Sequence, residues 1–184
     1  MRRKIGILWF YLIALVAFAT DQIAKKWIER TLNPGDRVEV LGDFFVLTLI
    51  RNSGAAFGIL QRQTVFFLTI TVIVVAGIVW YLHRSYRSSG FMLPTGLALI
   101  LGGAVGNFVD RALYGEVVDF LQFTFGKYVF PIFNLADTAI VTGVGLVLLD
   151  ALLAMRRESG EEQVHGETGR EDGPDREERP QLDG

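Results

Sequence analysis

Residues 64–82 read TVFFLTITVIVVAGIVWYL and contain no charged side chain. Their length is close to the roughly 20 residues that a helix needs to cross about 30 Å of hydrocarbon. Three more apolar stretches of similar character lie at 5–20, 91–109 and about 133–155. The sequence therefore predicts an all-α membrane protein with four transmembrane helices.

The composition of the 184-residue chain agrees with a membrane location and excludes several kinds of chemistry. Hydrophobic residues make up 51% of the chain, and they occur in blocks instead of recurring with the period of a soluble helix or strand. The absence of cysteine excludes disulfides, thiolate nucleophiles and thiolate metal sites. The two histidines, His83 and His165, lie far apart in the sequence, so we predict no multi-histidine metal site.

The first apolar stretch has two interpretations. Basic residues 1–4 (MRRK), followed by an apolar run and Ala17-Phe18-Ala19, are typical of a secretory signal peptide with a small-x-small cleavage site. In contrast, Trp27 and Ile28 continue a helical stripe beyond Thr20, which favours a retained helix. The residue pattern by itself leaves both interpretations open.

Basic residues near the helix ends predict the orientation in the membrane. On one side they are concentrated in very short segments, whereas on the other a similar number is spread over much longer segments. Short loops and the first helix weigh most in the positive-inside rule, so we predict that both termini lie in the cytoplasm. The basic residues of the short segments are Arg2, Arg3, Lys4, Arg84, Arg87, Arg156 and Arg157.

The outer segment at about residues 31–63 is predicted to contain a β-hairpin. Val38–Leu41 and Phe44–Ile50 are rich in β-branched and aromatic residues, and Gly42-Asp43 separates them. Pairing of the two strands would satisfy their backbone polar groups at the membrane surface, where lipid offers no partners.

The C-terminal residues 158–184 are acidic and almost free of apolar side chains. Such a segment cannot bury enough apolar surface to become ordered, so we expect a disordered cytoplasmic tail. Residues 1–157 are then expected to form a single four-helix membrane domain.

Two carboxylates stand in contrasting environments. Asp119 lies in the apolar run Val117–Leu121, where loss of solvation raises the pKa of a carboxyl group. Asp137 follows Asn134, the expected N-cap of the fourth helix, by three residues, and the helix dipole there favours an anion. A shared-proton aspartyl dyad requires one carboxyl group that acts as an acid and a second that acts as a base. The alternatives are a surface loop residue for Asp119 and a plain capping box for Asp137.

Polar residues lie on one face at the end of the third apolar stretch. Gly102 and Gly106 form a small-xxx-small pair that allows another helix to approach closely. Asn107, Asp110 and Arg111 follow at spacings of i, i+3 and i+4, so they share one helix face. This face can hold a polar site; alternatively, Asp110 and Arg111 only anchor the helix at the interface.

Two further features are ambiguous when taken alone. Asp21 and Lys25 form an i, i+4 pair, which is commonly no more than helix support. Residues 51–58 (RNSGAAFG) form a small-residue loop whose glycines permit close approach of the backbone to a ligand.

Five blocks of the sequence, taken in order, resemble the motifs of lipoprotein signal peptidase (signal peptidase II) over about residues 5–155. No motif position departs from the family pattern. The blocks are Asp21-Gln22-x-x-Lys25, Asn52-x-Gly54-Ala55-Ala56-Phe57, Gly102-Gly103-Ala104-x-Gly106-Asn107-x-x-Asp110-Arg111, Val117-Val118-Asp119-Phe120 and Phe133-Asn134-x-Ala136-Asp137.

The resemblance implies an aspartic endopeptidase without metal or cofactor. Such an enzyme removes signal peptides from bacterial prolipoproteins, cutting before a diacylglyceryl-modified cysteine at the outer face of the cytoplasmic membrane. The implied fold is four helices with a small extracytoplasmic β-cradle. The first helix is then retained, because cleavage after Ala19 would detach Asp21 from its membrane anchor. The implied partners are lipidated prolipoproteins and membrane lipid; we expect no nucleic-acid binding and a monomer.

The resemblance also implies roles for individual residues. Asp119 and Asp137 match the catalytic pair. The residues that match positions lining or supporting the site are Asp21, Lys25, Asn52, Gly54, Asn107, Asp110, Arg111, Asn134 and Ala136.

Two other classes of function fit the sequence less well. An ion-conducting transporter needs polar groups at several depths, whereas the middles of all four apolar stretches are apolar. A scaffold held together by small-xxx-small contacts would not need two acids beside apolar residues and a helix N-terminus.

Overall fold

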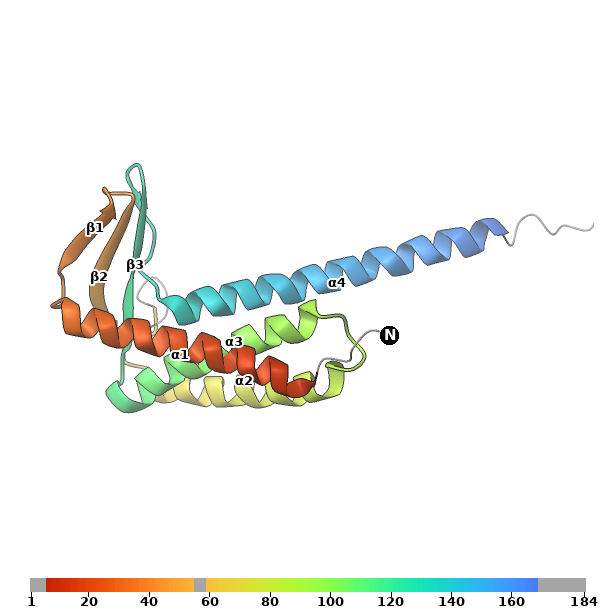
Figure 1. Cartoon of the computed structure of the whole chain (residues 1–184), viewed down its shortest axis with the longest axis horizontal. Helices are drawn as coiled ribbons and strands as arrows, with labels where there is room; N and C mark the ends of the chain where they lie inside the picture. Colours follow the sequence, from red (N-terminus) through yellow and green to blue (C-terminus); the bar gives the residue numbers. More distant parts are fainter. Residues whose placement is uncertain (1–5, 55–58, 169–184) are drawn as a thin grey trace, which may run out of the picture. The chain divides into compact units, whose positions relative to one another are not determined.

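The computed structural model describes residues 6–54 and 59–168, so Arg2, Arg3, Lys4 and the motif residues 55–57 lie outside the described residues. The chain divides into two compact units, one up to Leu148 and the other from Leu149 onward. The helices are α1 Ile7–Thr31, α2 Thr64–Ser85, α3 Met92–Tyr114 and α4 Leu135–Thr168, and the strands are β1 Arg37–Leu41, β2 Phe45–Asn52, β3 Val117–Phe125 and β4 Tyr128–Val129 (Figure 1).

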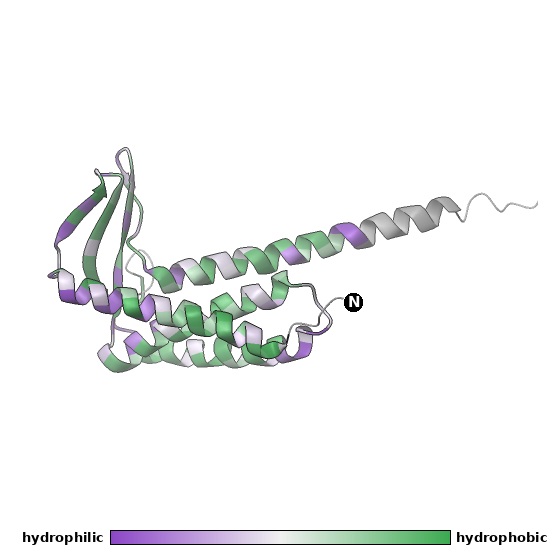
Figure 2. Cartoon of the chain, in the orientation of Figure 1, coloured by the Kyte–Doolittle hydropathy of each residue, from purple (hydrophilic) through white to green (hydrophobic). Residues whose placement is uncertain are grey.

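Four helices are long and apolar enough to span a membrane, as the sequence predicts. Their most apolar windows have mean hydropathies between 1.6 and 2.5. Apolar residues follow α1, α2 and α3 along most of their length. Polar residues gather at the ends of α1 and α3 near the strands and, on α2, at the opposite end (Figure 2). Only 6% of the window in α2 is buried inside the protein, so most of its apolar side chains are available to lipid.

α1 is a single helix that continues well past the first predicted span. It runs without a break through Ala19 and Thr20 to Thr31. Lys25 and Ile28 are buried, so the second half of the helix has a packed face of its own. The predicted continuation of the helical stripe is confirmed.

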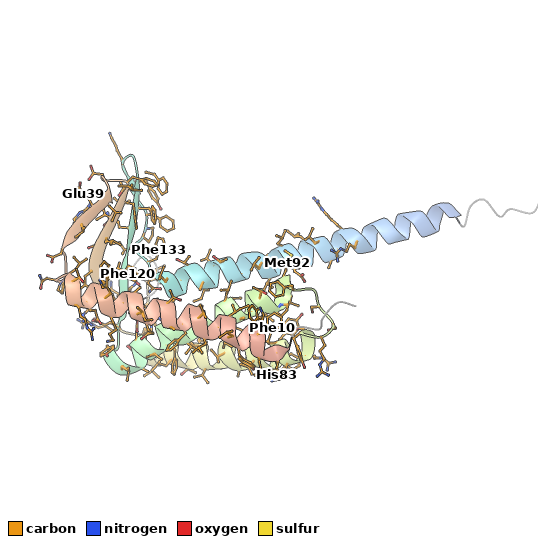
Figure 3. All side chains as sticks on the ribbon, viewed as in Figure 1. Phe10, Glu39, His83, Met92, Phe120 and Phe133 are labelled. Carbon is orange, nitrogen blue, oxygen red and sulfur yellow. The ribbon has the colours of Figure 1, made fainter. Side chains whose placement is uncertain are left out.

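α3 lies at the centre of the helical part of the first unit. Half of its most apolar window is buried. Phe10 of α1 and Leu82 of α2 pack with Leu101 of α3 in one hydrophobic core. Figure 3 shows Phe10 among the helices, away from Phe120 and Phe133 at the base of the sheet.

Glycine allows the neighbours of α3 to approach its backbone. A Cβ on Gly102 would collide with the carbonyl oxygen of Ala14 on α1, and a Cβ on Gly103 would collide with that of Ala136 on α4. A Cβ on Gly106 would lie 2.8 Å from the Asp21 carboxylate. The predicted close approach at this small-residue motif is confirmed, and two helices make use of it.

A four-stranded antiparallel sheet with the order β1-β2-β3-β4 lies at one end of α1, α2 and α3 (Figure 1). The predicted hairpin is confirmed as β1 and β2, with Gly42 in the turn at a φ of 51°. The sequence does not predict β3, because its first half, Val117–Phe120, is buried throughout and lacks the alternation of a half-exposed strand. The β-containing part of the protein is thus larger than residues 31–63.

The sheet is attached to the helices at two places. Ile28 of α1 packs with Leu49, Val118 and Phe120 in a second hydrophobic core. Phe133, just before α4, exchanges backbone hydrogen bonds with Leu121 of β3, at 3.1 and 2.8 Å. The chain therefore enters α4 directly beside β3.

The end of α4 requires a correction to the predicted tail. The helix continues to Thr168, whereas the sequence predicts disorder from residue 158. Residues 158–168 are rich in glutamate and contain glutamine, which are good helix formers, and a helix that is already nucleated adds residues at little cost. The prediction is corrected for residues 158–168, and residues 169–184 lie outside the described residues.

Candidate active site

Asp119 lies on β3, and its carboxylate accepts hydrogen bonds from two asparagine side chains. Asn52 Nδ2 donates to Oδ2 at 2.8 Å, and Asn134 Nδ2 donates to Oδ1 at 2.7 Å. Asn52 reaches the carboxylate because β2 and β3 are antiparallel partners, with Asn52 paired to Val117. The predicted apolar setting is confirmed, since Asp119 is only 4% exposed.

Burial raises the pKa of Asp119 to about 6, above its ordinary value of 3.8. Loss of solvation is the largest cause, and the negative charge of Asp137 adds to it. The hydrogen bonds from Asn52 and Asn134 and the positive charge of Lys25 act in the opposite direction. A carboxyl group with this pKa can exchange a proton close to neutral pH, as acid–base catalysis requires.

Asp137 lies in the first turn of α4, which Asn134 caps. The N–H of Asp137 donates to Asn134 Oδ1 at 2.9 Å, and the N–H of Asn134 donates to Asp137 Oδ2 at 3.3 Å. This reciprocal arrangement is the predicted capping box. Asp137 also accepts a hydrogen bond from outside the capping box, because Asn107 Nδ2 of α3 donates to Asp137 Oδ1 at 2.7 Å.

Asn107 and Asn134 join the two carboxylates into one network. The Asn134 side chain is fully buried and donates both to Asp119 and, at 3.2 Å, to Asn107 Oδ1. Asn107 in turn donates to Asp137. Residues from α3, β3 and α4 therefore meet in a single polar cluster.

A buried ion cluster on α1 and α3 supports this network. Lys25 Nζ lies 2.7 Å from Asp21 Oδ2 and 2.7 Å from Asp110 Oδ2, and it donates to Asn107 Oδ1 at 3.0 Å. The ammonium group therefore has three close oxygen neighbours, two of them on carboxylates. The Asn107 amide is consequently held with its oxygen toward Lys25 and its nitrogen toward Asp137.

The same cluster connects α1 to α4. Asp21 Oδ1 accepts the backbone N–H of Ala136 at 2.9 Å. Gln22, which belongs to the first motif block but had no predicted role in the site, donates to Asp110 Oδ1 at 3.0 Å and to the Gly106 carbonyl at 3.3 Å. Asp21 therefore does more than support its own helix, and Asp110 does more than anchor α3 at the interface.

The side chain of Arg111 contacts a different part of the site from that of Asp110. Its Nη2 donates to the Gly54 carbonyl at 3.1 Å, and its guanidinium carbon lies 4.7 Å from the centre of the Phe67 ring. Gly54 has no room for a side chain, because a Cβ there would lie 2.6 Å from the Ile59 carbonyl oxygen. The predicted shared face of Asp110 and Arg111 therefore serves two separate networks.

A pocket of about 300 Å³ opens beside the two carboxylates. Its polar wall contains both carboxylates, and its apolar wall includes the segment 130–133 that leads into α4. The arrangement offers a proton-exchanging carboxyl group, a second carboxylate and several N–H donors to a molecule in the pocket. The other lining residues are Asn52, Gly54, Asn107, Arg111, Val117, Ile140 and Val141.

A comparison with protein families identifies this arrangement. The family model described as "Signal peptidase (SPase) II" matches residues 13–153, which is most of the chain. The chain belongs to the signal peptidase II family. The resemblance of the five motif blocks is thereby confirmed.

Individual relatives of this signal peptidase II chain carry the name "Lipoprotein signal peptidase". One from Bacillus pumilus (strain SAFR-032) is 47% identical over 146 residues, which cover 79% of this chain and 94% of the relative. Another from Brevibacillus brevis (strain 47 / JCM 6285 / NBRC 100599) is 50% identical over 146 residues, which cover 79% of this chain and 96% of the relative.

Solved structures share the fold of this signal peptidase. One, described as "Bacterial membrane enzyme structure by the in meso method at 2.3 A resolution", has a TM-score of 0.76 and 39% sequence identity, covering 84% of this chain and 93% of that chain. A second, described as "Bacterial membrane enzyme structure by the in meso method at 1.9 A resolution", has a TM-score of 0.72 and 37% identity, covering 83% and 97%. This chain is thus a bacterial multi-pass membrane protein and a protease of the signal peptidase II family.

Two parts of the site in this signal peptidase were not assigned from its sequence. Phe67 lies outside all five motif blocks, and the apolar wall 130–133 belongs to a segment that looks like the start of the fourth span. One available signal is Pro131 directly before a helix cap, since a proline biases the preceding residue toward an extended conformation. Among the side chains described in residues 6–54 and 59–157, no group of three or more His, Cys, Asp or Glu could hold a metal ion.

Proposed function

We propose that this signal peptidase is an aspartic endopeptidase in which Asp119 and Asp137 share one proton. The observation that supports this most directly is that both carboxylates line one pocket and are joined through Asn107 and Asn134. Burial raises the pKa of Asp119 to about 6. Two neighbouring carboxyl groups cannot both ionise at low cost, so the pair holds one proton below about pH 6.

In the proposed reaction, Asp137 accepts a proton from water while the water oxygen attacks the carbonyl carbon of the scissile peptide bond. Asp119 then donates its proton to the nitrogen of the leaving group, and the C–N bond breaks. The pair still holds one proton, now on Asp137, and its transfer to Asp119 restores the starting state. Arg111 and Asn52 line the same pocket, and their N–H groups are the proposed donors to the oxyanion.

We propose lipidated prolipoproteins as the substrates, with the cut directly before the diacylglyceryl-modified cysteine. The name of the relatives supports this substrate class. A lipid-anchored substrate arrives laterally from the bilayer, which suits a pocket at the ends of membrane-spanning helices. We also propose that the enzyme is active as a monomer.

The test is cleavage of a purified prolipoprotein by the full-length enzyme in lipid nanodiscs. We expect a shortened product whose new N-terminal residue, identified by mass spectrometry, is the lipid-modified cysteine. The same prolipoprotein without the diacylglyceryl group serves as the control and should remain intact. A cut elsewhere in the chain, or equal cleavage of both forms, would contradict the proposed substrate.

The rate of cleavage is expected to fall as the pH rises through about 6, because Asp119 then loses the proton that it donates. Its raised pKa means that the folded enzyme holds this proton below about pH 6 and releases it above, so kcat/KM should have a descending alkaline limb. The apparent pKa of that limb belongs to the carboxyl pair. The measurement is kcat/KM against pH from about 4.5 to about 8.5.

Asn52→Ala provides the matched variant for this pH profile. It removes a hydrogen bond that lowers the pKa of Asp119, so the alkaline limb should move to higher pH. A rate that increases through pH 6 in the wild-type enzyme would assign the proton to the other carboxyl group.

We propose that both termini lie in the cytoplasm and that the sheet lies at the outer face of the membrane. Reporter fusions after Arg87 and after Arg157 should then give a cytoplasmic signal, and a fusion after Asn33 in the segment leading to β1 should give an outer signal. Alkaline phosphatase and green fluorescent protein fusions provide the readout. An outer signal from the Arg157 fusion would mean an odd number of spans.

A further inference from the structure

Phe67 is an aromatic residue of the site that none of the sequence motifs contains. It lies in the first turn of α2, and its ring centre is 4.7 Å from the Arg111 guanidinium carbon. This distance is within the range of a cation–π interaction. The ring is half-buried on a helix whose other side chains largely face outward.

A second contact fixes the register of α2 against α3 at this point. Thr64 Oγ1 donates to the carbonyl of Gly115 at 3.2 Å, where α3 ends in a left-handed residue with a φ of 76°. Thr64 and Phe67 are one turn apart on α2, and Gly115 and Arg111 are one turn apart on α3. The antiparallel helices therefore bring the Phe67 ring to the guanidinium as a consequence of their packing.

Arg111 has few other interactions that determine where its charged group lies. Its Nη2 donates to the Gly54 carbonyl, and its buried Nε has no hydrogen-bond partner among the described residues. Among the described residues, no carboxylate forms an ion pair with Arg111 within 4.0 Å. Of the nearby carboxylate charges, that of Asp137 acts on Arg111 most strongly. A long, rotamer-rich side chain with one hydrogen bond needs a further contact to hold one orientation.

We propose that Phe67 is a positioning residue of this peptidase. Its ring face holds the Arg111 guanidinium so that the unused N–H groups point to the carbonyl oxygen of the scissile bond as it becomes negative. This inference rests on the proposed function, because it assigns Phe67 to the stabilisation of the same oxyanion. Through Arg111, α2 contributes to a site whose remaining described residues come from α3, α4 and the sheet side of the protein.

The experiment compares Phe67→Leu with Phe67→Trp and with Phe66→Leu. Leucine keeps an apolar side chain but lacks a π-face, whereas tryptophan offers the strongest one. Phe66 is 49% exposed in the same helical turn and is the matched control. With the lipidated prolipoprotein, we expect Phe67→Leu to lower kcat and kcat/KM about tenfold with little change in KM, and both other variants to stay close to the wild type.

A spectroscopic measurement tests the contact itself. In arginine-labelled enzyme, the Arg111 Nε–H proton should show a ring-current shift that is lost in Phe67→Leu and retained in Phe67→Trp. Thermal unfolding of all variants separates positioning from a loss of stability. Wild-type kcat/KM in Phe67→Leu, or a lowered melting temperature together with no rescue by tryptophan, would overturn the role of Phe67. An inactive wild-type enzyme would instead overturn the proposed function.

Discussion

Replacing Asp119 or Asp137 with asparagine is expected to reduce cleavage by at least about a thousandfold. An amide keeps the shape of the side chain but can neither accept the proton of water nor hold the proton that the pair shares. Each single variant should therefore be nearly as inactive as the double variant, since the two groups act as one unit. The measurement is single-turnover cleavage of the lipidated prolipoprotein in nanodiscs.

Asp43→Asn is the matched control for this pair of variants. Asp43 is an exposed aspartate in the β1–β2 turn, on the same side of the protein as the site. Its variant should retain wild-type activity, and all variants should insert into the membrane and unfold at similar temperatures. Near-normal turnover by Asp119→Asn or Asp137→Asn would overturn the assignment, and Asp110 would become the next candidate.

Lys25→Met is expected to have the largest effect on stability, about 3–5 kcal/mol in the free energy of unfolding. Lys25 is 2% exposed and is the shared partner of Asp21 and Asp110, each at 2.7 Å. Its removal leaves two buried carboxylates close to one another without a positive charge. The variant should unfold at a much lower temperature in detergent, or fail to accumulate in the membrane.

The neighbouring Lys26→Met is the control for Lys25→Met. The Lys26 side chain is 50% exposed and forms a surface ion pair with Glu29 at 3.4 Å. Such pairs contribute about 0–1 kcal/mol, so the melting temperature should change little. Equal melting temperatures for the two variants would show that the Lys25 cluster does not stabilise the fold.

The sequence predicts the local elements of this protein well. The four spans follow from the length of the apolar runs, the β1–β2 hairpin from its β-branched residues and the Gly42 turn, and the start of α4 from Asn134. Each of these features depends on a residue and its near neighbours in the chain. The helical extension to Thr168 and the strand β3 were missed because helix propagation and burial on both faces leave no local periodic signal.

The assembly of the site depends on contacts between distant segments. Asn52 reaches Asp119 through the pairing of β2 with β3, and Lys25 reaches Asp110 because α1 packs against the glycines of α3. The motif order indicates that these residues belong to one site, but not which atom donates to which. Phe67 carries no motif signal at all, because its contact with Arg111 depends on the register of two helices.

By itself, then, the sequence determined how many times the chain crosses the membrane, where its helices begin, and which polar residues lie near the helix ends. These properties depend on transfer of side chains from water to lipid and on backbone capping, which act over one or a few helical turns. Only the tertiary structure decided which side chains donate to each carboxylate, which way the Asn107 amide faces, and which ring lies against Arg111. Desolvation and hydrogen-bond geometry depend on every segment that surrounds a group, and those segments come together only when the helices and the sheet pack.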